Sequence, residues 1–155
     1  MIDDNGYREN VGIILLNDKN MVLCGRRTGM LAWQMPQGGI EEGESPEVAM
    51  YRELEEEVGL RGKYVDLLGA TKNWLYYNLP ERYQRVGKKP RCIGQKQIWF
   101  LLKFKGDDSN ICLDLYQPQE FEDWNWFDYW KPIEMIIDFK KAVYREALTE
   151  LEILF

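Results

Sequence analysis

Histidine is absent from the 155-residue sequence, and this absence excludes whole classes of active site. No serine or cysteine nucleophile can be activated by an imidazole, and no metal ion can be bound through one. A general base must therefore be a carboxylate, a lysine, a tyrosine, a cysteine or water.

Cysteine is scarce, and long apolar runs are missing. Cys24, Cys92 and Cys112 are widely spaced, odd in number and without a C-x-x-C pair, so we expect reduced thiols in a cytoplasmic protein. The N-terminal MIDDNGYREN is acidic and polar, unlike a signal peptide, and no apolar run approaches the length that spans a membrane. We therefore expect no membrane partner.

The acidic charge is concentrated in one segment. Of the 26 acidic residues, eight fall within residues 41–57 together with one basic residue, and the formal net charge of the chain is −6. A cation bound there would leave a surface that does not repel phosphate. The segment 82–96 contains six positive charges and no acid, at Arg82, Arg85, Lys88, Lys89, Arg91 and Lys96.

The segment 46–58 is predicted to be a helix, and both of its ends are marked in the sequence. Ser45 is a good N-cap, and Pro46 suits the first helical position because its missing N–H would have no helical partner there. Gly59 is placed to end the helix in a left-handed conformation. An apolar stripe recurs every four residues, at Met50, Leu54 and Val58.

Glu53, Glu56 and Glu57 stand at i, i+3 and i+4 of this helix, so their side chains share a face. Carboxylates held so close repel each other, and a cation relieves that repulsion. Oxygen ligands suit Mg²⁺ or Mn²⁺ better than zinc, and Mg²⁺ is usually bound through carboxylates together with substrate phosphates. Glutamates at this spacing alone, however, are more typical of a solvated, acid-rich helix face.

The residues around these glutamates follow the pattern G-x5-E-x7-R-E-U-x-E-E-x-G-U, in which U is a bulky aliphatic residue. Its fixed positions are filled by Gly38, Glu44, Arg52, Glu53, Leu54, Glu56, Glu57, Gly59 and Leu60. The segment 38–60 therefore resembles the Nudix box of the Nudix hydrolases. The resemblance implies a loop–helix–loop that binds divalent metal and cleaves a nucleoside diphosphate linked to another group.

The remaining pattern predicts an α/β fold in one domain, residues 1–155. Strands mixed with two well-separated helices suggest a mixed β-sheet between helices, which matches the α/β/α sandwich that the Nudix resemblance implies. The expected strands are 11–16 and 21–27 as a hairpin, 64–78 with a bulge at Gly69, 98–104, 111–115 and one within 121–129, and 33–39 is expected to be a brief extended segment. The expected helices besides 46–58 are a short turn at 131–136 and a long helix at 139–154.

Segments outside the box resemble the bacterial RNA pyrophosphohydrolases over nearly the whole chain. They are MIDDNGYRENVGIILLN, WQMPQGGI, AMYRELEEEVGL, CIGQKQIWFLLKF and EFEDWNWFDYW. The resemblance implies conversion of the 5′-triphosphate or 5′-diphosphate end of single-stranded RNA to a monophosphate, which promotes mRNA decay. The sequence departs from that family by stopping at Phe155 without a longer basic tail and by lacking polar groups in the loop 28–32. We expect a monomer, and the sequence leaves open whether another protein activates it.

The box and the resemblance together suggest the metal ligands and the catalytic groups. Mg²⁺, which Mn²⁺ or another divalent cation could replace, is expected to bind Glu53, Glu56, Glu57 and a backbone carbonyl near Gly38. Glu120, from a loop outside the box, is a further candidate ligand. Glu53 and Glu57 are the predicted catalytic residues, with Glu53 as general base and Glu120 as its rival in that role.

Two residues of the box are predicted to act through others. Arg52 can pair with Glu56 one helical turn along and hold it in place. Glu44 is placed to orient Arg52 or a metal ligand. We therefore expect both residues to support the ligands structurally.

A further set of residues is predicted to contact substrate. Arg8 and Arg27 can donate paired hydrogen bonds to phosphate or stack on a base. The resemblance suggests that Phe139 stacks on a base near the RNA 5′ end while Lys140 hydrogen-bonds to it, although periodicity alone favours a core role for Phe139. The remaining candidates are Tyr77, Gln95 and the basic segment 82–96.

Other functions compete with this prediction. A diadenosine polyphosphate hydrolase or a nucleoside triphosphate pyrophosphatase would share the box and differ only in pocket contacts. A binding module that kept the fold and lost catalysis is disfavoured by the intact set of Arg52 and the three glutamates. No P-loop motif and no EF-hand loop is present, which excludes those two classes.

Overall fold

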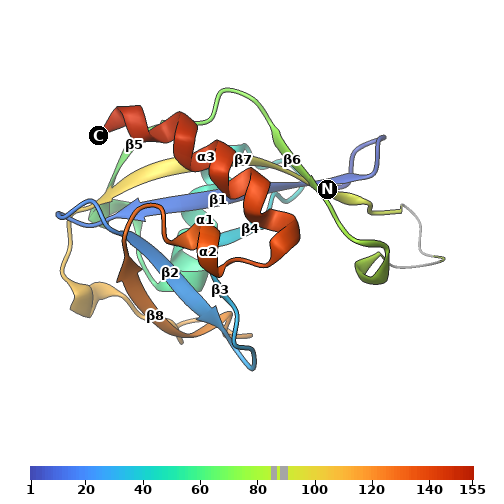
Figure 1. The fold of residues 1–155 in the computed structure, drawn as a ribbon. Helices are drawn as coiled ribbons and strands as arrows, with labels where there is room; N and C mark the ends of the chain where they lie inside the picture. The colour runs from blue at the N-terminus through green and yellow to red at the C-terminus, as the bar shows by residue number, and fades with distance from the viewer. Residues whose placement is uncertain (85–86, 88–90) are drawn as a thin grey trace.

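The computed structural model describes residues 1–84, 87 and 91–155 (Figure 1). Arg85, Lys88 and Lys89 of the basic segment therefore lie outside the described residues. The described strands form a single sheet and are β1 (Tyr7–Leu16), β2 (Val22–Arg27), β3 (Trp33–Gln34), β4 (Gln37–Gly39), β5 (Val65–Ala70), β6 (Leu75–Asn78), β7 (Gly94–Phe104) and β8 (Phe121–Phe127).

The centre of the sheet is the parallel pair β1 and β7, in register from Tyr7 opposite Gly94 to Leu16 opposite Lys103. The strand order is β3-β2-β1-β7-β5, with β4 added to β1, β6 to β7 and β8 to β2. The pairs other than β1–β7 are antiparallel. The sheet is mixed, as the sequence predicted.

Helices cover both faces of this sheet (Figure 1). Because side chains alternate along a strand, Ile13 and Leu15 of β1 pack on the side of α1, while Ile14 and Leu16 pack on the side of α3. The predicted α/β sandwich is therefore confirmed. None of the described helices combines the length and the apolar character that a membrane crossing requires. The helices are α1 (Pro46–Val58), α2 (Pro132–Met135) and α3 (Lys141–Leu151), with 3₁₀ turns at Gly62–Tyr64, Glu81–Tyr83, Asp108–Asn110, Asp138–Lys140 and Glu152–Leu154.

Helix α1 begins and ends where its capping residues predicted. The Ser45 side chain accepts a hydrogen bond from the Val48 amide at 3.2 Å. Gly59 adopts φ 72° and donates its amide to the Glu55 carbonyl. A Cβ at Gly59 would also collide with the Cys112 carbonyl, so glycine is required both for the left-handed turn and for the approach of the 111–120 loop.

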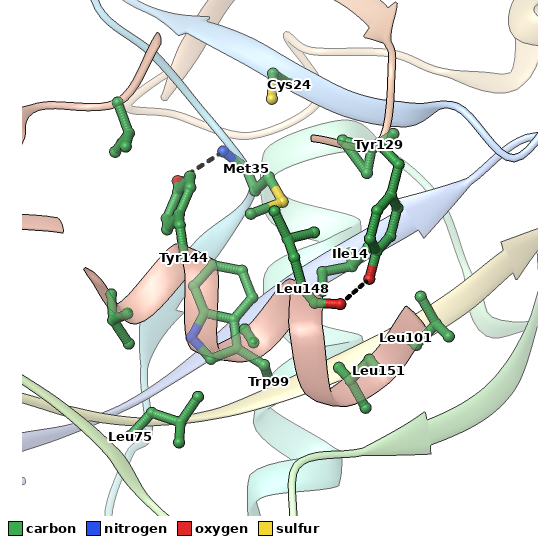
Figure 2. Close-up of a cluster of buried hydrophobic side chains, with 14 of the residues drawn as sticks. Ile14, Cys24, Met35, Leu75, Trp99, Leu101, Tyr129, Tyr144, Leu148 and Leu151 are labelled. Atoms are coloured by element: carbon green, nitrogen blue, oxygen red, sulfur yellow. Dashed lines mark hydrogen bonds between the residues drawn. The ribbon is translucent and has the colours of Figure 1, made fainter. Parts of the chain in front are cut away.

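Helix α3 is fastened to the sheet by two buried tyrosines (Figure 2). The Met35 amide donates to the Tyr144 hydroxyl at 3.0 Å, and the Tyr129 hydroxyl donates to the Leu148 carbonyl at 2.6 Å. The Tyr144 ring meets the edge of Trp99, with 5.2 Å between ring centroids. The Tyr144 bond fixes the first half of α3 against the segment that joins β3 to β4, and the Tyr129 bond holds its second half against the residues that follow β8.

The structure corrects several predicted elements. The expected strand at 111–115 is wrong: the Cys112 amide bonds to the Val58 carbonyl at the end of α1, so this segment closes a helix instead of extending the sheet. The predicted 64–78 strand is two strands, β5 and β6, and the register shift between Leu67 and Gly69 confirms the bulge. The predicted helix 139–154 consists of α3 and the 3₁₀ turns at its two ends.

Candidate active site

A cavity of about 520 Å³ opens between α1, β4 and the 111–120 loop. It collects residues that are far apart in the sequence and that were predicted to bind metal, namely Gly38, Glu53, Glu56, Glu57 and Glu120. Three of the predicted substrate contacts also line it, Arg27, Gln95 and Lys140. The cavity therefore sets carboxylates against cationic side chains in one place.

Strand β4 brings the backbone to within contact of the helix carboxylates. A Cβ added to Gly38 would overlap the carboxyl group of Glu53, so only glycine permits this approach. One residue earlier, the Gln37 amide donates to Glu57 Oε1 at 3.1 Å. Glu57 is 4 % exposed, and its Oε2 is buried without a hydrogen-bond partner in the described structure. A buried acceptor of this kind is costly unless a ligand meets it.

Arg52 joins the glycine-rich loop to the acidic face of α1. Its guanidinium grips Glu44 with two bonds, Nε to Oε2 at 2.7 Å and Nη2 to Oε1 at 2.8 Å. It also donates to Glu53 Oε1 at 2.7 Å, to the Gly39 carbonyl at 2.8 Å and to Glu56 Oε2 at 3.3 Å. The predicted contacts of Arg52 with Glu56 and with Glu44 are both present, and the shorter bonds go to Glu44 and Glu53.

Burial and charge act in opposite directions on these acids. Hydrogen bonds from Arg52 lower the pKa of Glu44 to about 2. Burial raises the pKa of Glu53 to about 7 against the opposing effect of Arg52, and burial with the neighbouring charge of Glu53 raises the pKa of Glu57 well above its usual range. The single contact from Arg52 therefore does not offset the burial of Glu53, and the Gln37 amide does not offset that of Glu57.

The opposite side of the cavity carries positive charge. Arg27, at the end of β2, lies 3.8 Å from Glu120 between Nε and Oε1. Lys140 is 9 % exposed, and burial together with the charge of Arg27 lowers its pKa to about 8. An anion bound between Arg27 and Lys140 would stabilise the protonated form of Lys140, which burial disfavours.

Three predicted substrate contacts do not line this cavity. Tyr77 is 6 % exposed, and the Lys140 ammonium nitrogen lies over its ring, 5.7 Å from the ring centroid. Phe139 packs against Tyr77 and Tyr83, with centroids 5.9 and 5.5 Å apart, and faces a separate cavity. Arg8 is exposed and stands opposite Gln95 in the β1–β7 register.

Comparison with known proteins assigns this chain to a family. The NUDIX domain family matches residues 6–151. The chain belongs to the Nudix family. An RNA pyrophosphohydrolase of Methylococcus capsulatus is 55 % identical over 152 residues, covering 98 % of this chain and 80 % of the relative. An RNA pyrophosphohydrolase of Acinetobacter baylyi is 54 % identical over 151 residues, covering 97 % and 91 %.

Solved structures share the Nudix fold at low sequence identity. The E. coli dihydroneopterin triphosphate pyrophosphohydrolase has a TM-score of 0.74 at 20 % identity, covering 95 % of this chain and 97 % of that one. A C. elegans Ap4A hydrolase in a binary complex has a TM-score of 0.67 at 16 % identity, covering 94 % and 99 %. At these identities the likeness shows the fold alone.

Nudix hydrolases generally require divalent cations, and the residues of this cavity fit such an ion. The donors are hard oxygens, one of which, Glu57 Oε2, is buried and unpartnered. The described residues do not, however, contain three acidic or cysteine side chains already arranged to hold a metal. Arg52 and the Gln37 amide hold Glu53 and Glu57 by one oxygen each, so a cation and its phosphate ligands would have to complete the set.

Several lining residues of the Nudix cavity were missed from the sequence. Gln34 and Gln37 flank Met35 and Pro36, and their side chains enter the cavity because β3 and β4 run along its edge. The two glutamines of WQMPQGG could have indicated polar contacts at Gln34 and Gln37. The others come from the 111–120 loop, which has no periodicity to read, and are Tyr116, Gln117 and Pro118.

Proposed function

We propose that this Nudix protein is a metal-dependent RNA 5′-pyrophosphohydrolase that converts 5′-triphosphate or 5′-diphosphate RNA ends to 5′-monophosphate and so promotes mRNA decay. The observation that carries the proposal is the cavity that brings three glutamates of α1 and Glu120 of the 111–120 loop together with Arg27 and Lys140. Cations held by the acids and basic side chains opposite them form a cradle for a chain of phosphates. Relatives that are more than half identical and are named RNA pyrophosphohydrolases support this choice of substrate.

In the proposed reaction, water attacks a phosphorus of the 5′-polyphosphate and a phosphoanhydride bond breaks. Pyrophosphate leaves a triphosphate end, or phosphate leaves a diphosphate end, and the RNA keeps a 5′-monophosphate. Mg²⁺ would neutralise phosphate oxygens and lower the pKa of a bound water when it is held by the Gly38 carbonyl, Glu53, Glu56, Glu57 and Glu120. The chain supplies the remaining groups.

Glu53 accepts the proton of the attacking water in this proposal. Arg52 holds it through Oε1, and the missing side chain of Gly38 gives it room beside the cavity. Glu120 is the alternative base, from the opposite wall. Arg27 and Lys140 bind phosphate oxygens, and Tyr77 supports Lys140 from below.

The proposal also covers the domain organisation, the oligomeric state and the contacts with RNA. We propose that residues 1–155 form one Nudix domain, because a single sheet serves both apolar cores. We propose a cytoplasmic monomer whose substrate is the 5′ end of single-stranded RNA. Arg8, Gln95 and Phe139 are proposed to contact the RNA beyond the phosphates.

The test is a comparison of substrates with the purified protein and Mg²⁺. Triphosphorylated RNA, diphosphorylated RNA, diadenosine tetraphosphate and free nucleoside triphosphates are offered in parallel, and the products are identified by chromatography. We expect the highest kcat/KM on an RNA 5′ end, with product that a 5′-monophosphate-dependent exonuclease degrades, and no turnover with a chelator. A clear preference for the dinucleotide would instead support the diadenosine polyphosphate hydrolase, and no turnover on any substrate would support a binding module.

A further inference from the structure

Tyr116 presents an aromatic ring at the edge of a charged cavity. Among the described lining residues it is the aromatic one, and it is 43 % exposed. The neighbouring walls are carboxylates, amides and basic groups, which suit phosphate rather than a ring. Covering an exposed aromatic face with another flat, apolar surface is favourable, because it removes apolar area from water.

The loop that carries Tyr116 is tied down at both ends. At its start the Cys112 amide bonds to the Val58 carbonyl at 3.0 Å, and Gly59 leaves no space for a Cβ against Cys112. At its end the Thr28 amide bonds to the Glu120 carbonyl at 3.0 Å. The loop therefore spans from the end of α1 to the end of β2 and holds Tyr116 and Glu120 on the same cavity wall.

Phe139, which the sequence predicted to stack on a base, lies away from the carboxylate cavity. Phe139 packs on Tyr77 and Tyr83 and lines a different cavity, together with Arg82 and Asp138. In the described part of the chain, the stacking surface next to the carboxylates therefore comes from Tyr116. A cavity of about 520 Å³ is of the size that holds a small-molecule ligand.

We propose that Tyr116 stacks on the nucleobase of the 5′-terminal nucleotide, an inference that rests on the proposed function. The polyphosphate and this base belong to the same nucleotide, so phosphates placed over the glutamates bring the base to the edge of the cavity. Stacking tolerates any base, because each has a π-face. Tyr116 thus adds affinity for a nucleotide over bare polyphosphate without reading its sequence.

Steady-state kinetics with two matched RNAs test this assignment. One RNA carries a 5′-triphosphate on an adenosine, and the other carries it on an abasic ribose. The variants are Tyr116→Ala, Tyr116→Phe and the control Leu115→Ala, which truncates an adjacent exposed side chain outside the cavity lining. Calorimetry in parallel compares binding of α,β-methylene ATP with binding of inorganic triphosphate, and thermal melting checks folding.

We expect Tyr116→Ala to raise KM for the adenosine RNA roughly tenfold with kcat within about twofold, since loss of one stacked base is of this size. Tyr116→Phe and Leu115→Ala should match the wild type, and the abasic RNA should not distinguish Tyr116→Ala from it. Equal changes on both RNAs, or none, would overturn the assignment. If the wild type cleaves no RNA, the proposed function fails by itself, and calorimetry still decides: stacking requires that Tyr116→Ala weaken α,β-methylene ATP but not triphosphate.

Discussion

Adding one methyl group at Gly38 should disable the site. A Cβ there overlaps the Glu53 carboxyl group, so alanine forces that side chain out of position. The displaced carboxylate loses its 2.7 Å bond from Arg52, and a hydrogen bond between charged groups contributes about 1.5–3 kcal/mol. If Glu53 holds metal or accepts the proton of water, its displacement should lower kcat by about 10²-fold or more, equivalent to ~3 kcal/mol of transition-state stabilisation.

The neighbouring glycine supplies a matched control. A Cβ on Gly39 would meet nothing closer than the Glu9 carbonyl oxygen at 4.0 Å. Gly39→Ala should therefore stay within about twofold of the wild type, while Gly38→Ala loses activity on triphosphorylated RNA at saturating Mg²⁺. A loss of about 2 kcal/mol in Gly38→Ala should also lower Tm by roughly 4–8 °C. Equal kcat in the two variants would refute the claim that Glu53 must occupy this position.

Three further predictions concern the acidic helix face. Glu57→Gln should reduce kcat by about 10²-fold, whereas Glu55→Gln, the same change on α1 outside the cavity, should leave kcat nearly unchanged in the same assay. Burial raises the pKa of Glu53 to about 7, so the folded, metal-free protein keeps a proton that the unfolded chain releases near pH 4.3. Its free energy of unfolding should therefore fall by roughly 1–3 kcal/mol from pH 5 to pH 7, measured by urea titration with a chelator, and a rise instead would contradict the burial argument. Arg52→Lys cannot reproduce the two bonds to Glu44 and should lower kcat/KM at least tenfold while Tm falls, and unchanged kinetics would remove Arg52 from the support of Glu53.

The parts of the site that could be predicted from the sequence are those governed by local rules. The caps of α1 depend on Ser45, Pro46 and Gly59 within one helix, and they lie where the pattern placed them. The acids at i, i+3 and i+4 share a face by helix geometry alone. The roles of these acids in metal binding and catalysis stay predictions.

What could not be predicted depends on contacts between distant segments. The 111–115 segment has the composition of a strand, but the Cys112 amide donates to the Val58 carbonyl at the end of α1. No local pattern in the sequence predicts that hydrogen bond. The sequence proposed contacts of Arg52 with both Glu56 and Glu44, and only the folded loop shows that Glu44 is the closer partner. Periodicity favoured a core position for Phe139, and its packing on Tyr77 and Tyr83 agrees with that half of the prediction.

The position of the cavity follows from the way one strand edge is shared. β7 occupies one edge of β1 along its whole length, so β2 and β4 must both use the other edge. β4 pairs with β1 at residues 10–12, and β2 pairs with it at Leu16 only. β2 therefore leaves β1 and pairs with β3 and β8 instead, as the divergence of β2 from β1 in Figure 1 shows.

Arg27, at the end of β2, and Gly38, in β4, both line the cavity. In this cavity the glutamates of α1, from one face of the sheet, meet Lys140, which directly precedes α3 on the other face. The short pairing of β1 with β2 is therefore as much a part of the proposed active site as the glutamates.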